Sequence, residues 1–152
     1  MLNHQEIKSF NPQRYPIALI DRIVTLTPGE RVVALKAVTA TEACYRGIGD
    51  QVGIEALAYP PSLMTESFCQ AAGPLCAQSG LDFNSKVMLF VSMAEVEYLG
   101  RAYPGDVMRH EVRIVKVLSD AVVLSGEVTV DGAVVARFGQ MVVAARERGA
   151  LA

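Results

Sequence analysis

Cysteine is scarce in this sequence of 152 residues, in which only Cys44, Cys69 and Cys76 occur. Their number is odd and no two of them form a CxxC pair, which argues against a disulfide framework and against a zinc site. We therefore expect a reducing, cytoplasmic environment, no bound metal and no other cofactor. Cys69 and Cys76 lie seven residues apart in an apolar segment, where they are expected to be buried thiols.

An excess of basic charge and long apolar runs are missing as well. The net charge is −2 and the isoelectric point is about 5.7, which gives no electrostatic footprint for nucleic acid or an anionic membrane. The apolar stretches are interrupted before the roughly 18 residues that a membrane span needs. The first ten residues also lack the basic and apolar regions of a signal peptide. We expect neither a nucleic acid nor a membrane as partner.

Apolar residues are abundant instead. Hydrophobic residues make up 51% of the chain and charged residues 20%, a composition that favours a packed core over disorder. The length suits one domain, so residues 1–152 are expected to form a single domain.

The first half of the chain predicts a hairpin and a long loop. Strands are expected over residues 17–26 and 31–38, because a Thr-Pro-Gly-Glu turn at 27–30 separates two apolar, β-branched segments. Residues 39–59 show no clean periodicity and contain three glycines. Such a long loop in a compact domain is usually functional or contains a short element of its own.

The second half predicts one helix followed by strands. Pro60 and Pro61 suit a helix start, with Ser62 as a cap, and the following apolar residues cover much of the helix circumference. We expect Gly73-Pro74 to kink this helix and Gly80 to end it. An antiparallel meander is expected over residues 86–99, 107–118, 122–130 and 133–145.

These elements predict an α+β fold, in which a curved antiparallel sheet wraps one long central helix. The final turn of the meander, Asp131-Gly132, is typical of a two-residue hairpin. A single open sheet leaves edge strands, and dimerisation through an edge would cover one of them.

Five groups of residues, in this order and spacing, resemble the motifs of a known family. They are Arg14-Tyr15-Pro16 with residues 19–23, Lys36 to Thr39 with Glu42, Pro60 with Leu63, Met64, Glu66 and Gln70, Tyr103 to Asp106, and Val130 to Gly132. Together they resemble the β-hydroxyacyl-(acyl carrier protein) dehydratases of type II fatty-acid synthesis. The resemblance runs from about Pro12 to Ala145 and implies a single hotdog domain.

The resemblance also implies a composite active site between two subunits. In such dehydratases one subunit supplies a histidine from the loop before the helix and a main-chain N–H at the helix start. The other subunit supplies an aspartate or glutamate one turn into the helix. A base removes the α-proton, an acid protonates the leaving hydroxyl, and the N–H stabilises the enolate-like oxygen. The implied partner is an acyl carrier protein that carries a phosphopantetheine-linked acyl chain.

This chain matches only one half of that site. Glu66 occupies the position of the catalytic carboxylate, and Gln70 lies on the same helix face as a supporting residue. Ile48 aligns with the histidine. Pro61, which has no N–H, aligns with the glycine whose main-chain N–H binds the thioester carbonyl. Losing such a donor typically costs about 10²–10³ in rate, and losing the base about 10²–10⁴.

We therefore predict a subunit of a 3-hydroxyacyl thioester dehydratase in fatty-acid or polyketide synthesis, weak or inactive alone. It would form a dimer, either with itself or with a histidine-containing paralogue that receives Glu66. Two other functions stay open. In an acyl-thioester hydrolase, Glu66 alone would suffice for catalysis. In a non-catalytic scaffold or acyl-binding subunit, Glu66 would only stabilise the helix through its interaction with the helix dipole.

Other polar residues have weaker claims to a role in chemistry. His110 alternates with apolar residues in a strand and is expected to be a structural histidine. Cys44 has no histidine nearby in sequence to activate it. Asp50 and Glu55 in the long loop are possible replacements for the missing acid–base group, and Arg101 is a possible contact for a carrier-protein phosphate. All three are solvated surface charges by default.

Overall fold

The computed structural model describes residues 1–81 and 86–147 of the chain. In chain order the elements are β1 (Leu2–Asn3), α1 (His4–Ile7), β2 (Arg22–Thr27), β3 (Arg31–Ala37), the 3₁₀ helices η1 (Ala43–Tyr45) and η2 (Ile54–Leu57), α2 (Pro61–Ala77), β4 (Lys86–Tyr98), β5 (Val107–Val117), β6 (Ala121–Val130) and β7 (Ala133–Glu147).

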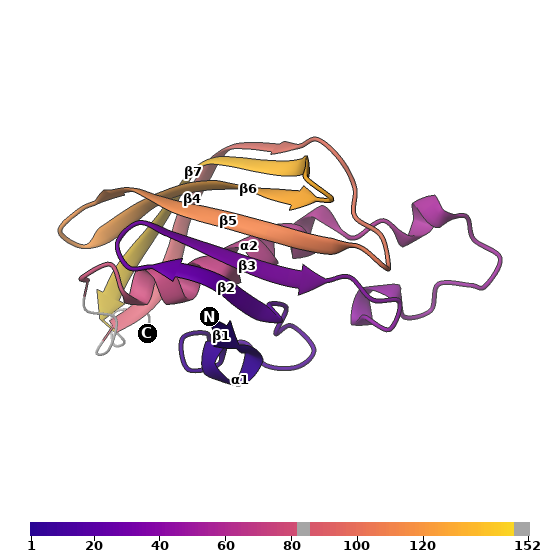
Figure 1. Cartoon of the computed structure of the whole chain (residues 1–152), viewed down its shortest axis with the longest axis horizontal. Helices are drawn as coiled ribbons and strands as arrows, with labels where there is room; N and C mark the ends of the chain where they lie inside the picture. Colours follow the sequence, from indigo (N-terminus) through magenta and orange to yellow (C-terminus); the bar gives the residue numbers. More distant parts are fainter. Residues whose placement is uncertain (82–85, 148–152) are drawn as a thin grey trace.

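The described strands form one antiparallel sheet in the order β1-β2-β3-β5-β6-β7-β4. Figure 1 shows this sheet curving around α2, which confirms the expected α+β hotdog architecture. The expected meander is wrong in one respect. β4 does not lie beside β5 but pairs with β7 at the far edge, while β5 pairs with β3 and joins the two halves of the chain.

The starts of β2 and α2 differ from the sequence expectation. β2 begins at Arg22 rather than at residue 17, because the main chain of Ile17 and Leu19 is bonded to a side chain of α2 instead of to a strand. Ser62 does not cap α2, since the helix begins at Pro61 with Pro60 as its N-cap.

The end of α2 also differs from expectation. The helix continues through Gly73 and Pro74 and ends at Ala77, before Gly80. Gly73 has a packing role, because a Cβ at this position would overlap the side-chain oxygen of Asn11. The N-terminal segment can therefore lie directly on the helix surface there.

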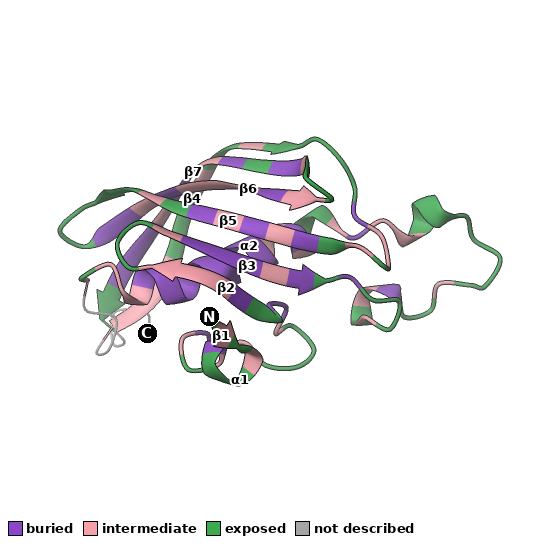
Figure 2. Ribbon diagram, viewed as in Figure 1, coloured by how far each residue is buried: buried purple, intermediate pink, exposed green. Residues whose placement is uncertain are grey.

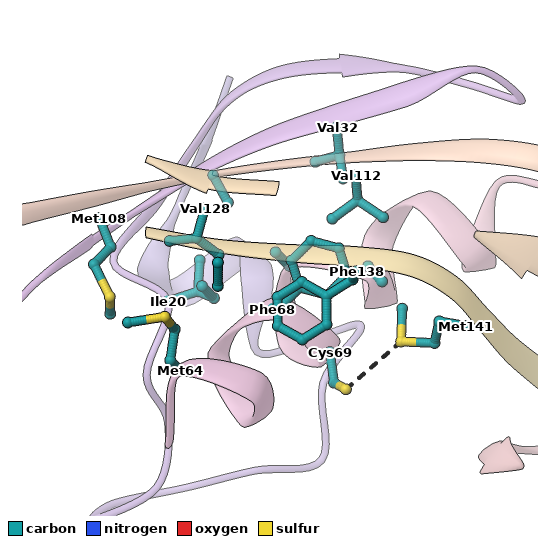
Figure 3. Close-up of a cluster of buried hydrophobic side chains, with 14 of the residues drawn as sticks. Ile20, Val32, Met64, Phe68, Cys69, Met108, Val112, Val128, Phe138 and Met141 are labelled. Carbon is teal, nitrogen blue, oxygen red and sulfur yellow. Dashed lines mark hydrogen bonds between the residues drawn. The ribbon is translucent and has the colours of Figure 1, made fainter. Parts of the chain in front are cut away.

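The core forms where the middle of α2 meets the concave face of the sheet. Phe68 and Phe138 are both fully buried, and their rings stack with centroids 4.1 Å apart. Buried residues of α2 and of the strands surround this stack (Figure 3). Phe68 and Phe138 are the largest of the fully buried side chains, so they fix how the helix sits in the sheet.

The segment between β3 and α2 extends beyond the end of the sheet (Figure 1). It holds η1 and η2, and residues 49–56 are all exposed (Figure 2). Val52 and Ile54 are among the exposed large apolar residues. We call residues 49–56 the arm, because they lie outside the body of the domain. Among the described helices none is both long and apolar enough to cross a bilayer.

Replacing Gly126 tests how closely β6 packs against its neighbour β5 and against α2. A Cβ at Gly126 would overlap the carbonyl oxygen of Glu111 and lie 2.9 Å from Cζ of Phe68. We expect Gly126→Ala to lower the free energy of unfolding by about 1–3 kcal/mol, measured by urea denaturation. The matched change Gly49→Ala, where a Cβ meets nothing within 4 Å, should have no such effect. Equal urea midpoints for both variants would contradict this packing.

Candidate active site around Glu66

Glu66 lies in the second turn of α2 and is half-buried. Its Oε1 atom accepts two hydrogen bonds, one from Nε2 of Gln70 at 2.7 Å and one from Nε2 of Gln13 at 3.1 Å. Gln70 reaches it because residues four apart lie on the same face of a helix. The structure thus brings Glu66 and Gln70 together and adds a residue that the sequence analysis did not single out.

Gln70 is bonded at both ends of its side-chain amide and is only 3% exposed. Besides Glu66, its Nε2 donates to the carbonyl oxygen of Ile17 at 2.7 Å, and its Oε1 accepts from the main-chain N–H of Leu19 at 2.8 Å. A buried amide that loses such partners costs about 1–3 kcal/mol for each orphaned group. Gln70 therefore holds the N-terminal segment against α2.

Gln13 comes to the site from the N-terminal segment, 53 residues away from Glu66 in sequence. Its neighbours fix the main chain there. Asn11 Nδ2 donates to the carbonyl oxygen of Gln70, and Arg14 Nη1 donates to the carbonyl oxygens of Asn11 and Gln13. The one signal in the sequence that could have marked Gln13 is its position directly before the Arg-Tyr-Pro motif.

The start of α2 offers no donor at Pro61. The main-chain N–H groups of Leu63 and Met64 both donate to the carbonyl oxygen of Pro60 at 3.0 Å, and Pro61 itself has no N–H. A hollow of about 290 Å³ opens beside exposed Pro61, and Glu55 and Arg101 line it as well. A carbonyl oxygen placed there would find no main-chain hydrogen on Pro61.

Ile48 lies just after η1, at the base of the arm. Its side chain is half-buried and packs against the hydrophobic core of its own chain. The base of the arm is anchored by a partly buried ion pair, in which Nζ of Lys36 lies 2.9 Å from Oε1 of Glu42. Ile48 is thus an apolar packing residue at the position that the resemblance assigns to a histidine.

The charged residues of the arm do not converge on Glu66. Asp50 is exposed. Glu55 forms an ion pair with Arg101, and its Oε2 also accepts a hydrogen bond from the hydroxyl of Tyr103 at 3.2 Å. Glu55 and Arg101 therefore neutralise each other on the surface where η2 meets the turn before β5.

His110 is fully buried on the concave face of β5. Its Nε2 lies 3.2 Å from Oγ of Ser67, whose hydroxyl donates to the carbonyl oxygen of Met64. The imidazole therefore donates from Nε2, while Nδ1 has no hydrogen-bond partner among the described residues. Burial, with a smaller effect of Lys36, lowers the pKa of His110 to about 3. His110 is a neutral structural histidine that bonds Ser67 and not Glu66.

The cysteines have the properties of packing residues. Burial raises the pKa of Cys69 and of Cys76 to about 12, and burial together with the charge of Glu42 raises the pKa of Cys44. A thiol with a raised pKa is a poor nucleophile and metal ligand. In the described parts of the chain, no group of three or more Cys, His, Asp or Glu side chains could hold a metal ion.

A groove of about 650 Å³ runs beside the Glu66 cluster. Residues 8–14 form one wall, β4 another, and the face of α2 from Cys69 to Ala77 lies between them, with Gln13 and Gln70 among the lining residues. Its volume lies within the range of small-molecule sites. The carboxyl group of Glu66, held by these same two glutamines, thus lies next to a groove of ligand size.

Comparison with known sequences gives a consistent family. The model of the FabA-like domain matches residues 11–139. The chain is 38% identical over 135 residues to the 3-hydroxyacyl-(acyl-carrier-protein) dehydratase FabZ of Roseiflexus castenholzii, covering 89% of this chain and 91% of that protein. It is 32% identical to the FabZ of Solibacter usitatus, covering 90% of this chain and 81% of that protein.

Comparison with solved structures supports the same fold. One match is a chain described as the dehydratase heterocomplex ApeI:P from Xenorhabdus doucetiae, with a TM-score of 0.74, 14% identity, and 95% of this chain and 93% of that chain covered. Another is the PaaI protein of E. coli, with a TM-score of 0.61, 15% identity and 80% of each chain covered. At these identities the matches show the hotdog fold alone.

The buried imidazole predicts a pH dependence of stability. The native pKa of His110 is about 3, below its ordinary value of 6.5, so between these values the unfolded chain binds a proton that the native chain does not. Stability should therefore fall as the pH drops below about 6.5, by roughly 1.4 kcal/mol per pH unit. Urea denaturation at pH 7 and pH 5 should show this loss in the wild type and in His4→Gln, but not in His110→Gln. An equal loss in all three would contradict it.

Proposed function

Because the chain belongs to the FabA-like family of hotdog dehydratases, we propose that it is a dehydratase-like subunit of fatty-acid or polyketide synthesis. Its substrate would be a 3-hydroxyacyl thioester carried on the phosphopantetheine of an acyl carrier protein. The FabZ relatives, which cover most of the chain at 32–38% identity, support this reaction class. The observation that carries the proposal is the carboxyl group of Glu66, held on α2 by two amides beside a groove of ligand size.

In the proposed reaction Glu66 is the general acid. The carboxylic acid gives its proton to the hydroxyl on C3 as the C3–O bond breaks, while a base takes a proton from C2. The products are the 2-enoyl thioester and water, and the proton held by the base restores Glu66 before the next turnover. A positioned acid or base of this kind typically contributes about 10²–10⁴ in rate.

We further propose that the base and the carbonyl donor come from a histidine-bearing partner subunit. Two features of this chain support that assignment. Ile48 packs into its own core where the family pattern has a histidine, and Pro61 has no N–H where the pattern has a glycine. Both changes fall in the same half of the composite site, whereas the carboxylate of the other half is present. A pair of these chains would hold two defective sites, while a mixed pair would hold one complete site.

The edge strand β4 supports assembly as a dimer. It is 13 residues long and pairs with β7 on one side only, and Phe90, Val91 and Tyr98 are exposed along it. An exposed, apolar edge of this length is a template for pairing with another chain. The likeness in fold to a chain of a dehydratase heterocomplex supports pairing with a different subunit.

Substitution of Glu66 tests this proposal. The chain alone should dehydrate a 3-hydroxyacyl thioester of acyl carrier protein slowly or not at all, and the complex with a histidine-bearing paralogue should be active. In the complex, Glu66→Gln should lower kcat by about 10²–10⁴, followed by the absorbance of the enoyl thioester. The control Glu30→Gln changes an exposed turn residue and should keep full activity.

Three results would count against the proposal, each in favour of a different alternative. Full dehydratase activity of the chain alone would indicate a self-sufficient site. Release of free thiol that depends on Glu66 would indicate an acyl-thioester hydrolase. Unchanged activity of the complex with Glu66→Ala would indicate a scaffold or acyl-binding subunit.

A further inference from the structure

The orientation of the Gln13 side-chain amide leaves one of its two polar atoms unsatisfied. Its Nε2 donates to Glu66, and its Oε1 is buried with no hydrogen-bond partner among the described residues. Turning the amide by half a turn would move the oxygen out of this position, but it would place that oxygen against the acceptor atom of Glu66. The observed orientation therefore leaves Oε1 of Gln13 without a donor, which destabilises the fold. It directs an N–H group of Gln13 to Oε1 of Glu66.

The two glutamines that contact Glu66 differ in what else they bind. Gln70 joins the helix to the main chain of Ile17 and Leu19, so it also holds the fold together. Among the described residues the side chain of Gln13 makes its one hydrogen bond to Glu66. The contribution of Gln13 is thus directed to the carboxyl group alone.

Together the two amides determine how the carboxyl group can carry a proton. An oxygen of a carboxyl group has two lone pairs, and Oε1 of Glu66 already accepts two N–H groups, at 2.7 and 3.1 Å. The acid form must therefore carry its proton on Oε2. Without Gln13, one lone pair of Oε1 would become available and the proton could occupy either oxygen.

We propose that Gln13 is a positioning residue that confines the acidic proton of Glu66 to Oε2. This inference rests on the proposed role of Glu66 as general acid. It deepens that role, because a proton on a fixed oxygen meets the leaving hydroxyl in a single geometry. Misplacing a reacting group by about 1 Å can cost 10²-fold in rate, so this confinement matters for turnover and not for substrate binding.

The test compares Gln13→Met with wild type in the active complex. Methionine keeps the length of the side chain and removes both the donor and the orphaned oxygen. We expect kcat to fall on the order of 10- to 100-fold with KM unchanged. The midpoint of urea unfolding should stay the same or rise, because a buried unsatisfied acceptor has been removed. The control Gln5→Met alters an exposed glutamine of α1 and should change none of these values.

The outcomes separate this inference from the proposed function. If Glu66→Gln abolishes turnover while Gln13→Met does not change kcat, the proposed function stands and the role of Gln13 is wrong. A fall in kcat that is accompanied by a lower unfolding midpoint would indicate a merely structural role and would also overturn it.

A measurement without turnover covers the remaining case, in which no partner yields an active complex. In the ¹⁵N-labelled chain, the side-chain amide resonances of Gln13 should shift with Glu66→Ala, while those of Gln5 should not. If the Gln13 resonances do not respond, the contact is absent and the inference fails whatever the function of the protein.

Discussion

The amide of Gln70 is the contact on which the geometry of the site depends. It lies in the buried part of α2 and binds three groups at once: the carbonyl of Ile17, the N–H of Leu19 and the carboxyl group of Glu66. Through the first two bonds the N-terminal segment is held against the helix, and this brings Gln13 to the same carboxyl oxygen. A buried amide satisfies its hydrogen bonds only in such an arrangement, so the fold and the orientation of Glu66 depend on the same side chain.

The burial of α2 explains why the carboxyl group sits near the helix start. From Ser67 to Cys76 every residue of the helix is buried against the sheet or the N-terminal segment. An acidic side chain in that stretch would need partners for each of its oxygens. Glu66 directly precedes that stretch and is half-buried, so one oxygen can be held by amides while the rest of the group remains accessible. The fold thus allows an acid at this turn, beside the groove formed with β4 and the N-terminal segment.

The sequence predicted the features that depend on neighbouring residues. The hairpin at Asp131-Gly132 forms as expected, because both residues adopt the positive φ angles, 48° and 83°, that such a turn requires. The inward orientation of His110 followed from the alternation of a strand, and the juxtaposition of Glu66 and Gln70 from helical spacing.

Features that depend on distant residues were not predictable in the same way. The place of β4 at the edge follows from its pairing with β7, and periodicity within β4 says nothing about its neighbour. Gln13 reaches Glu66 because residues 11–19 run along α2 instead of extending β2, and no local pattern marks that path. The start of α2 was misjudged at Ser62 because Pro60 takes the N-cap position without a side-chain hydrogen bond.

Counting active sites tests the central claim most directly. If this chain gives only the carboxylate and its partner gives the histidine and the carbonyl donor, a mixed dimer holds one complete site. Titration of the purified complex with a mechanism-based inactivator that labels the catalytic histidine should therefore end at one equivalent per heterodimer. The label should be found on the partner and not on this chain. Two equivalents per dimer, or label on this chain, would contradict the account.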